Sequence, residues 1–341
     1  MHKKESVVYD VVIAGGGPAG LNAALMLGRV RRRVLLADSG EPRNAPSAAV
    51  HGFLTRDGDD PAQLRRIARE QLAAYPTVRL LDAAAESAAR AGDGFEVTLA
   101  GGPPAHARRL LLATGVTDEL PAVEGLARLW GRGVYHCPYC HGWEVRDQPV
   151  AVLGGDDAAA HLALSLARLG CDVVLCADGP LAASQAAREA LRPAGVRVCE
   201  DLVLGVVGEP GRYVRLSLSP GWTLERRALF VHPPFRQRSD LAARLGCAVL
   251  EDGAVQVNEL GQTTVPGVYA AGDMGRTLAM PGPAAQVVMA AAAGARAAVV
   301  IDQEMLFTDS YGGQGPVPPA ASRGMGAADG PEEGPPRGAG R

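Results

Sequence analysis

The chain has 341 residues, of which 47% are apolar and 21% charged, a balance typical of a globular protein long enough for two domains. Its formal net charge of −3 excludes the strongly basic surface that binds nucleic acid or anionic membranes. No run approaches the roughly 20 apolar residues that cross a bilayer, and residues 7–14 lead into glycines rather than a signal-peptide cleavage site. We therefore expect a cytoplasmic protein.

The N-terminal segment predicts the start of a parallel α/β domain. Residues 9–14 form an apolar run suited to a strand that is covered on both faces of a sheet. Small and apolar residues recur at helical spacing over 18–30, and residues 34–37 form a second apolar run. This order of strand, helix and strand is the beginning of a dinucleotide-binding unit.

The turn between the first strand and the helix fits the pattern G-x-G-x-x-G. Gly15 allows the tight turn, Gly17 lets backbone amides approach a pyrophosphate, and Gly20 allows close contact between helix and strand. Asp38, 21 residues after Gly17, ends the second strand, where a carboxylate accepts hydrogen bonds from ribose hydroxyls. We expect these residues to bind a dinucleotide together with the two that complete the turn, Pro18 and Ala19.

The next informative segment is Cys137-Pro138-Tyr139-Cys140, which is flanked by His136 and His141. We expect no metal here, because no second Cys-x-x-Cys follows and four adjacent ligands are awkward for tetrahedral zinc. A structural disulfide is unusual in a cytoplasmic enzyme. A redox pair is favoured, because one close thiol forms a mixed disulfide that the other resolves. A neighbouring imidazole can stabilise a thiolate or move its proton, although either histidine could instead only pack.

The other cysteines carry no such spacing and lie in apolar contexts. We expect them to be buried and unreactive thiols: Cys171, Cys176, Cys199 and Cys247.

A second strand–helix–strand pattern covers residues 150–153, 158–169 and 172–176. Later in the chain an apolar strand ends in Gly272-Asp273, and a helix is expected to begin near residues 283–286. A Gly-Asp pair alone is an ordinary turn. Beside the glycine pattern, Asp273 is a candidate for holding the ribitol chain of a flavin, and the helix N-terminus would favour negative charge on the reduced ring.

These elements predict an α/β fold with two Rossmann-like dinucleotide-binding domains of the three-layer ββα type, the second inserted into the first. The first domain comprises residues 1–118 and 238–310, and the insertion comprises residues 119–237 and carries the cysteine pair. Residues 311–341 are rich in Gly and Pro and are expected to be a disordered tail.

The order of these motifs resembles the low-molecular-weight thioredoxin reductase family of flavoproteins, over almost everything from residue 9 to residue 301. The resemblance rests on residues 15–20, the Cys-x-x-Cys of the inserted domain, residues 267–273 followed by 286–294, and the crossing segment Ala113-Thr114-Gly115. It implies FAD as the cofactor and a homodimer. It also implies that Cys140 faces the flavin while Cys137 exchanges with the substrate.

The resemblance adds two candidates for contact with the flavin. Asn44 lies in a loop similar to the family segment that passes the ring, where it could hydrogen-bond the ring or help to activate a thiol; it is equally well an ordinary turn residue. Gln286 aligns with the helix start beneath the flavin.

One departure from the reductases concerns the second dinucleotide turn, Gly154-Gly155-Asp156-Asp157. Asp156 replaces the second glycine of the G-x-G, which must approach a phosphate closely, and Asp157 adds negative charge. Asp178 stands where the reductases place arginines for the 2′-phosphate of NADPH. A carboxylate at that position does not exclude NADH, but the acidic turn disfavours either nicotinamide dinucleotide.

If a nicotinamide does not supply electrons, the flow plausibly reverses. The segment 137–142 is similar to the dithiol oxidases of this family, which close disulfides in natural products of the holomycin and gliotoxin type and return electrons to O2, giving H2O2. The resemblance therefore implies a small-molecule dithiol substrate, with Cys137, Cys140 and the candidate base His141 as catalytic residues. Two alternatives remain open: a disulfide reductase fed by NAD(P)H or another donor, and a flavin-bearing redox sensor.

Overall fold

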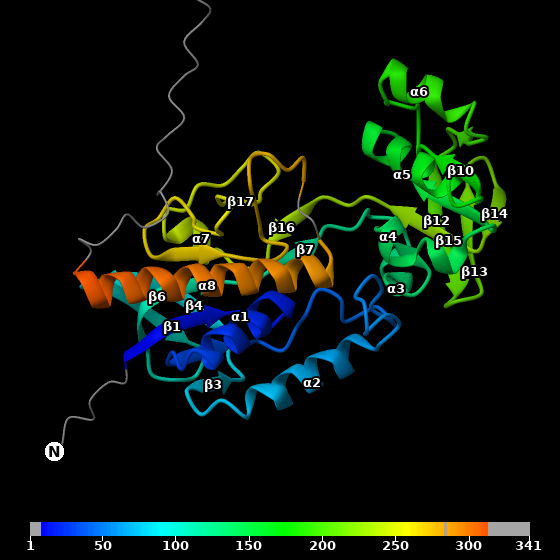
Figure 1. Cartoon of the computed structure of the whole chain (residues 1–341). Helices are drawn as coiled ribbons and strands as arrows, with labels where there is room; N and C mark the ends of the chain where they lie inside the picture. Colours follow the sequence, from blue (N-terminus) through cyan, green and yellow to red (C-terminus); the bar gives the residue numbers. More distant parts are fainter. Residues whose placement is uncertain (1–7, 283–284, 313–341) are drawn as a thin grey trace, which may run out of the picture.

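The computed structural model describes residues 8–282 and 285–312. They form two α/β units joined by two crossing segments (Figure 1). The α/β class expected from the sequence is confirmed. Within the described residues, no helix is long and apolar enough to cross a membrane.

The first unit is built on a seven-stranded sheet in the order β3-β2-β1-β6-β5-β4, with β18 also paired to β6. The strands β1, β2, β3, β6 and β18 run parallel, whereas β4 and β5 form an antiparallel extension. The strands are β1 Val8–Ala14, β2 Val34–Ala37, β3 Val78–Leu81, β4 Ala85–Ala91, β5 Gly94–Leu99, β6 Ala105–Leu112 and β18 Val268–Ala270.

Helices α1 (Pro18–Arg29) and α8 (Val287–Tyr311) lie side by side on one face of this sheet, as Figure 1 shows. Their close contact depends on a glycine, because a Cβ on Gly294 would lie 2.0 Å from the carbonyl oxygen of Ala19. The opposite face packs against α7 (Leu241–Arg244) and the pair β17 (Val255–Gln256) and β19 (Gly275–Arg276). Helix α2 (Pro61–Leu72) follows the loop after β2.

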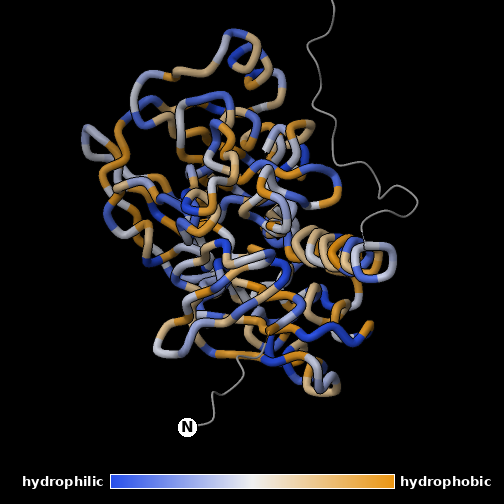
Figure 2. The backbone as a smooth tube through the Cα atoms, turned by 90° about the vertical axis from the view of Figure 1, so that its left-hand side faces the viewer, coloured by the Kyte–Doolittle hydropathy of each residue, from blue (hydrophilic) through white to orange (hydrophobic). Residues whose placement is uncertain are grey.

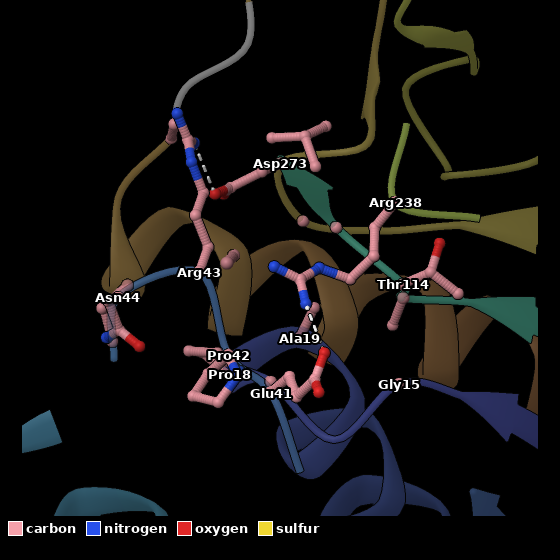
Figure 3. A pocket seen from close by; sticks show the side chains of 18 of the residues that line it. Gly15, Pro18, Ala19, Glu41, Pro42, Arg43, Asn44, Thr114, Arg238 and Asp273 are labelled. Carbon is pink, nitrogen blue, oxygen red and sulfur yellow. Dashed lines mark hydrogen bonds and ion pairs between the residues drawn. The ribbon is translucent and has the colours of Figure 1, made fainter. Parts of the chain in front are cut away.

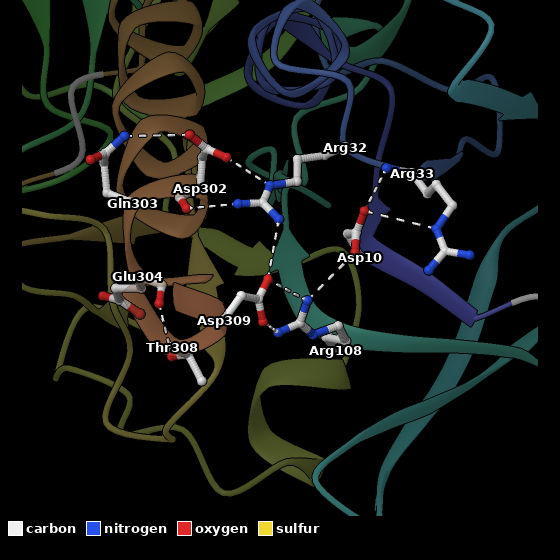
Figure 4. A network of polar contacts seen from close by, with 9 residues as sticks. All are labelled: Asp10, Arg32, Arg33, Arg108, Asp302, Gln303, Glu304, Thr308 and Asp309. Carbon is white, nitrogen blue, oxygen red and sulfur yellow. Dashed lines mark hydrogen bonds and ion pairs between the residues drawn. The ribbon is translucent and has the colours of Figure 1, made fainter. Parts of the chain in front are cut away.

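The last helix ends later than the sequence suggested, because α8 includes Tyr311, the first residue of the expected tail. Ion pairs hold its C-terminal half: Arg32, in the loop before β2, donates to Asp302 at 2.7 Å, and Arg108 of β6 donates to Asp309 (Figure 4). Gly312, at φ 57°, then ends the helix in the left-handed conformation. The rest of the expected tail, residues 313–341, lies outside the described residues.

The second unit has a five-stranded parallel sheet in the order β11-β10-β9-β15-β8. An antiparallel sheet of three strands is inserted in the chain between β11 and β15. The parallel strands are β8 Val134–Tyr135, β9 Pro149–Leu153, β10 Asp172–Cys176, β11 Arg197–Cys199 and β15 Ala228–Val231. The antiparallel strands are β12 Val203–Glu209, β13 Tyr213–Leu218 and β14 Trp222–Arg226. The helical elements are α3 Leu126–Leu129, α4 Pro138–His141, η1 Trp143–Val145, α5 Asp157–Ala167 and α6 Gln185–Leu191.

The chain passes between the units through β7 (Val116–Asp118) and returns through β16 (Phe235–Gln237), and these two strands pair antiparallel. Each unit has its own apolar clusters, two in the first and two in the second. Hydrophobic and hydrophilic residues are interleaved along the backbone of both (Figure 2). Each unit therefore has its own core, and the two-stranded ribbon β7/β16 connects them.

Candidate active site: a dinucleotide cradle facing a disulfide

A cavity of about 920 Å³ extends from the glycine turn of the first unit to the cysteine segment of the second. It brings together most of the residues that the sequence singled out. Those lining it are Gly15, Gly17, Pro18, Ala19, Asp38, Asn44, Ala113, Thr114, Gly115, Cys140, His141, Gly272, Asp273 and Gln286. Gly20 and Cys137 are not among the lining residues.

The glycines of the turn have separate roles. A Cβ on Gly15 would lie 2.2 Å from the carbonyl oxygen of Ala113, and one on Gly20 would lie 1.9 Å from the carbonyl oxygen of Gly15. Both clashes are with backbone, so these two positions must be glycine for α1 to pack on the strands. A Cβ on Gly17 meets nothing within 4 Å. Gly17 borders open space where a phosphate would approach.

The N-terminus of α1 has no protein anion on it. Its N-cap residue, Gly17, makes no side-chain cap hydrogen bond, and the first turn contains no acidic residue. The free N–H groups and the positive end of the helix dipole therefore fit a pyrophosphate.

Asp38 lies at the end of β2, as expected, but its oxygens already have protein partners. Oδ2 accepts hydrogen bonds from Arg65 at 2.8 Å and from Arg69 at 3.4 Å, and Oδ1 accepts from the N–H of Gly40 at 3.1 Å. Its side chain lies against Gly16, where a Cβ would come within 2.3 Å of the carboxylate. Asp38 thus also fixes the glycine turn to α2.

Arg43, which the sequence did not single out as a site residue, joins two acidic residues at the cavity. Its guanidinium donates to Asp118 at 3.0 Å through Nε. It also donates to Asp273 at 2.8 Å through Nη1 (Figure 3). Burial raises the pKa of Asp273, and the positive charge of Arg43 opposes that rise. No local pattern reveals Arg43, because its partners are 75 and 230 residues away.

Cys137 and Cys140 form a disulfide at the start of α4. Cys140 faces the cavity, whereas Cys137 is only 9% exposed. The neighbouring side chains Tyr139 and Trp143 are 83% and 64% exposed, so this corner of the second unit also faces solvent. Of the remaining cysteines, three are buried as expected, but Cys199 is partly exposed because it lies on the edge strand β11.

Both histidines beside the disulfide are neutral at physiological pH. His141 stacks on Tyr135 with ring centroids 4.2 Å apart, and its Nε2 lies 3.2 Å from Ser47 Oγ. Burial, with smaller contributions from His51 and His136, lowers the pKa of His141 to about 4. His136 stacks on Trp130, and burial and the charge of Arg43 lower its pKa to about 4.

The second dinucleotide turn is closed by its own side chains. Asp156 Oδ1 accepts the N–H of Ala159 at 2.9 Å and so caps α5. Asp157 accepts the N–H of Ser184 at 2.5 Å, and the carbonyl oxygen of Gly155 accepts the N–H of Ala182 at 2.8 Å. A carboxylate and a returning loop occupy the place where a phosphate would bind at a helix N-terminus.

Asp178, the acidic residue at the position where the reductases place arginines, accepts a hydrogen bond from within the second unit. Its Oδ1 accepts the N–H of Val203 at 2.7 Å, which ties the loop after β10 to β12.

A dinucleotide cradle that opens onto a disulfide defines a class of protein, the nucleotide-dependent thiol–disulfide oxidoreductases. The chain belongs to the pyridine nucleotide-disulphide oxidoreductase family, whose family model matches residues 9–297. It is therefore an oxidoreductase that acts on thiols and disulfides and uses a flavin.

Two solved structures and one curated relative are similar over most of their length. The crystal structure of HlmI is 39% identical, with a TM-score of 0.82, and the similarity covers 92% of this chain and 96% of HlmI. An oxidoreductase from Agrobacterium tumefaciens is 36% identical, with a TM-score of 0.81, covering 88% of this chain and 99% of that one. Thioredoxin reductase tcpT of Claviceps purpurea is 33% identical, covering 80% of this chain and 88% of the relative. The thioredoxin reductase-like resemblance is confirmed.

Proposed function

We propose that the protein is an FAD-dependent dithiol oxidase that closes a disulfide in a small-molecule dithiol. One observation carries the proposal: the open dinucleotide turn of the first unit shares a cavity with Cys140, whereas the second dinucleotide turn is closed by Asp156. Such a chain has a site for one dinucleotide beside the disulfide and lacks an open phosphate site at the turn through which a nicotinamide would be bound.

The first site fits FAD in its chemistry. The uncapped N-terminus of α1 suits the pyrophosphate, and Asp273 at the end of β18 can accept hydrogen bonds from the ribitol. The N-terminal end of α8, at Gln286, borders the same cavity and favours negative charge there. When bound, FAD would take two electrons from the reduced cysteine pair and pass them to O2, which yields H2O2.

The cysteines carry the exchange with substrate. A substrate thiolate attacks Cys137 Sγ, the bond to Cys140 breaks, and a mixed disulfide forms. The second substrate thiolate then attacks the substrate sulfur of that mixed disulfide. This closes the product disulfide and leaves both enzyme cysteines reduced. The substrate thus loses two electrons and two protons, and the neutral His141 is placed to accept a proton from a thiol.

Cys137 has little exposed surface in the oxidised chain, so substrate access requires a local change. Helix α4 has a single turn, and its residues are not buried. We expect α4 to open locally and present Cys137, because such short surface elements open at low free-energy cost.

A second candidate is a disulfide reductase, which the similarity to thioredoxin reductase tcpT favours. Stopped-flow spectroscopy of the purified flavoprotein under anaerobic conditions separates the two. We expect dithiothreitol to bleach the flavin far faster than micromolar NADPH or NADH, and O2 to restore the colour with formation of H2O2. Fast bleaching by NADPH would establish the reductase instead.

We also propose a homodimer located in the cytoplasm. Light scattering during gel filtration tests the assembly, and a mass of about 35.3 kDa, that of one chain, would exclude the dimer.

A further inference from the structure

Ser47 lies in the loop after β2 and contacts His141 from a distance of 94 residues along the chain. Its hydroxyl makes two contacts: Oγ is 2.8 Å from the carbonyl oxygen of Ala49 and 3.2 Å from Nε2 of His141. Nothing in the sequence pattern marks this serine. Among the described contacts, Ser47 is the residue that hydrogen-bonds to the side chain of His141, which directly follows Cys140.

The two contacts together determine the direction of the bond to the histidine. A carbonyl oxygen only accepts, so the single hydroxyl hydrogen of Ser47 is used by Ala49. The Ser47 oxygen must then accept from His141, which requires a hydrogen on Nε2. A neutral imidazole carries one N–H, and the other nitrogen is therefore bare.

We propose that Ser47 is a positioning residue that selects the Nε2–H tautomer of His141 and leaves Nδ1 as the ring nitrogen that accepts protons. The catalytic part of this inference rests on the proposed function of His141. Among the described hydrogen bonds the Ser47 side chain makes none to the disulfide, and it acts through the imidazole. It has the orienting role that the third member of a catalytic triad has toward its histidine.

The surroundings of His141 fix the ring plane as well as its tautomer. Tyr135 stacks on one face at an interplanar angle of 13°, and burial raises the pKa of this phenol, so it stays neutral. His51 meets the ring edge-on, at 6.2 Å between centroids. Among the described contacts, it is the hydrogen bond to Ser47 that distinguishes the two ring nitrogens.

The titratable groups around His141 come from three elements. His51, on the loop after β2, lies 3.5 Å from Asp57 and 3.6 Å from Glu144 of η1. His136, on the turn after β8, adds to the field that keeps the imidazole neutral. None of these groups hydrogen-bonds to a His141 nitrogen among the described contacts, so their titration would shift the proton affinity of the ring but not exchange its tautomer.

The test uses the flavin-loaded protein with Ser47→Ala and the hydroxyl-retaining variant Ser47→Thr. Ser165→Ala is the matched control, because Ser165 donates only to a carbonyl of its own helix, His161. Long-range ¹H–¹⁵N spectra of protein labelled in its imidazole nitrogens report the tautomer. We expect Nε2–H in the wild type, a mixture with Nδ1–H in Ser47→Ala, and a return toward Nε2–H in Ser47→Thr. An unchanged tautomer in Ser47→Ala would overturn the proposal.

Turnover of dithiothreitol supplies the second readout. Loss of one hydrogen bond predicts about a fivefold fall in kcat for Ser47→Ala, with KM little changed. In a His141→Gln background the same serine change should have no further effect, whereas a loop that had merely lost its structure would slow that variant again. A wild type that shows the predicted tautomer but no dithiol oxidation would refute the proposed function and leave the positioning role intact.

Discussion

Two half-buried imidazoles flank the disulfide. His136 and His141 both lose their charge through burial, and the pKa of each falls to about 4. At neutral pH His141 is therefore an acceptor of protons and supplies no positive charge to a thiolate. Of the two roles open to it from the sequence, stabilising a thiolate by charge or moving its proton, the structure favours the second.

The two cysteines should differ in a spectroscopic experiment. Cys137→Ser leaves a free Cys140 thiolate at the cavity, so we expect a long-wavelength charge-transfer absorbance with oxidised flavin. Cys140→Ser should lack this band and still form a mixed disulfide with substrate, detectable by mass spectrometry. Both variants should lose turnover. The band appearing in Cys140→Ser alone would reverse the two assignments.

The pH dependence of stability follows from the same histidines. The unfolded chain takes up a proton on each near pH 6.5, whereas the folded chain does so only near pH 4. Between these values the unfolded state binds more protons, so stability is fully present above pH 6.5 and falls as the pH falls toward 4. From pH 7 to pH 5 we expect a loss of about 2 kcal/mol per histidine in urea denaturation. His141→Gln should show roughly half of this slope, and a wild-type stability independent of pH in this window would contradict the assignment.

At the scale of elements, the two dinucleotide turns differ in how the free N–H groups at the helix N-terminus are satisfied. Helix α1 begins at an uncapped glycine beside an open cavity, and α5 begins at Asp156, which accepts a hydrogen bond from its first turn. Both turns follow a parallel strand, and both were visible in the sequence. The difference lies at the helix N-terminus: that of α1 has no side-chain cap and is open to a ligand, whereas that of α5 is capped by Asp156.

A matched pair of glycine variants tests the first turn. Gly17→Val places its side chain in open space, so the apoprotein should fold normally and yet fail to retain the flavin. Gly20→Ala drives a methyl group into the carbonyl oxygen of Gly15, so the fold itself should be destabilised. Circular dichroism and flavin absorbance after gel filtration distinguish the two. Full retention of flavin by Gly17→Val would show that this turn does not bind the pyrophosphate.

How much of the fold and the site could be predicted from the sequence depends on how far apart the contacting residues lie along the chain. The glycine turn, the parallel strands and the cysteine pair are encoded within a few residues, and strand and helix patterns repeat locally. Arg43 and Ser47 could not be found in this way, because their partners are 75 to 230 residues away along the chain. The contact of Ser47 with His141 forms only when the two units come together. Asp156 was recognised as an obstacle to phosphate, but its positive role as a helix cap required the geometry.

At the scale of the whole molecule, Arg43 ties the first unit to the ribbon β7/β16 that leads to the second unit. Asp118 ends β7, the first strand of the ribbon that connects them, and Asp273 follows β18 of the first unit. One guanidinium thus holds the ribbon to the wall of the cavity. This contact depends on the positive charge of Arg43, because the largely buried carboxylates of Asp118 and Asp273 would otherwise repel each other.

Arg43→Met should therefore be strongly destabilising. Two largely buried carboxylates lose their counter-charge, for which we expect a cost of about 3–5 kcal/mol in chemical denaturation. The double variant Arg43→Met with Asp118→Asn should recover part of this loss, since one of the two charges is removed. A cost below about 1 kcal/mol would place the pair among ordinary surface ion pairs.

The capping of α5 by Asp156 also bears on how the enzyme's stability couples to its metabolites. A helix N-terminus that is open to a phosphate is stabilised only when the nucleotide is bound. The stabilisation grows with the logarithm of the nucleotide concentration relative to its dissociation constant. Asp156 is a permanently attached anion, so the second unit reaches its full stability without any dissociable partner. Under the proposed function, ligand-linked stabilisation is then expected in the first unit alone, and the supply of flavin, rather than the cellular level of nicotinamides, is expected to set how much of the protein stays folded.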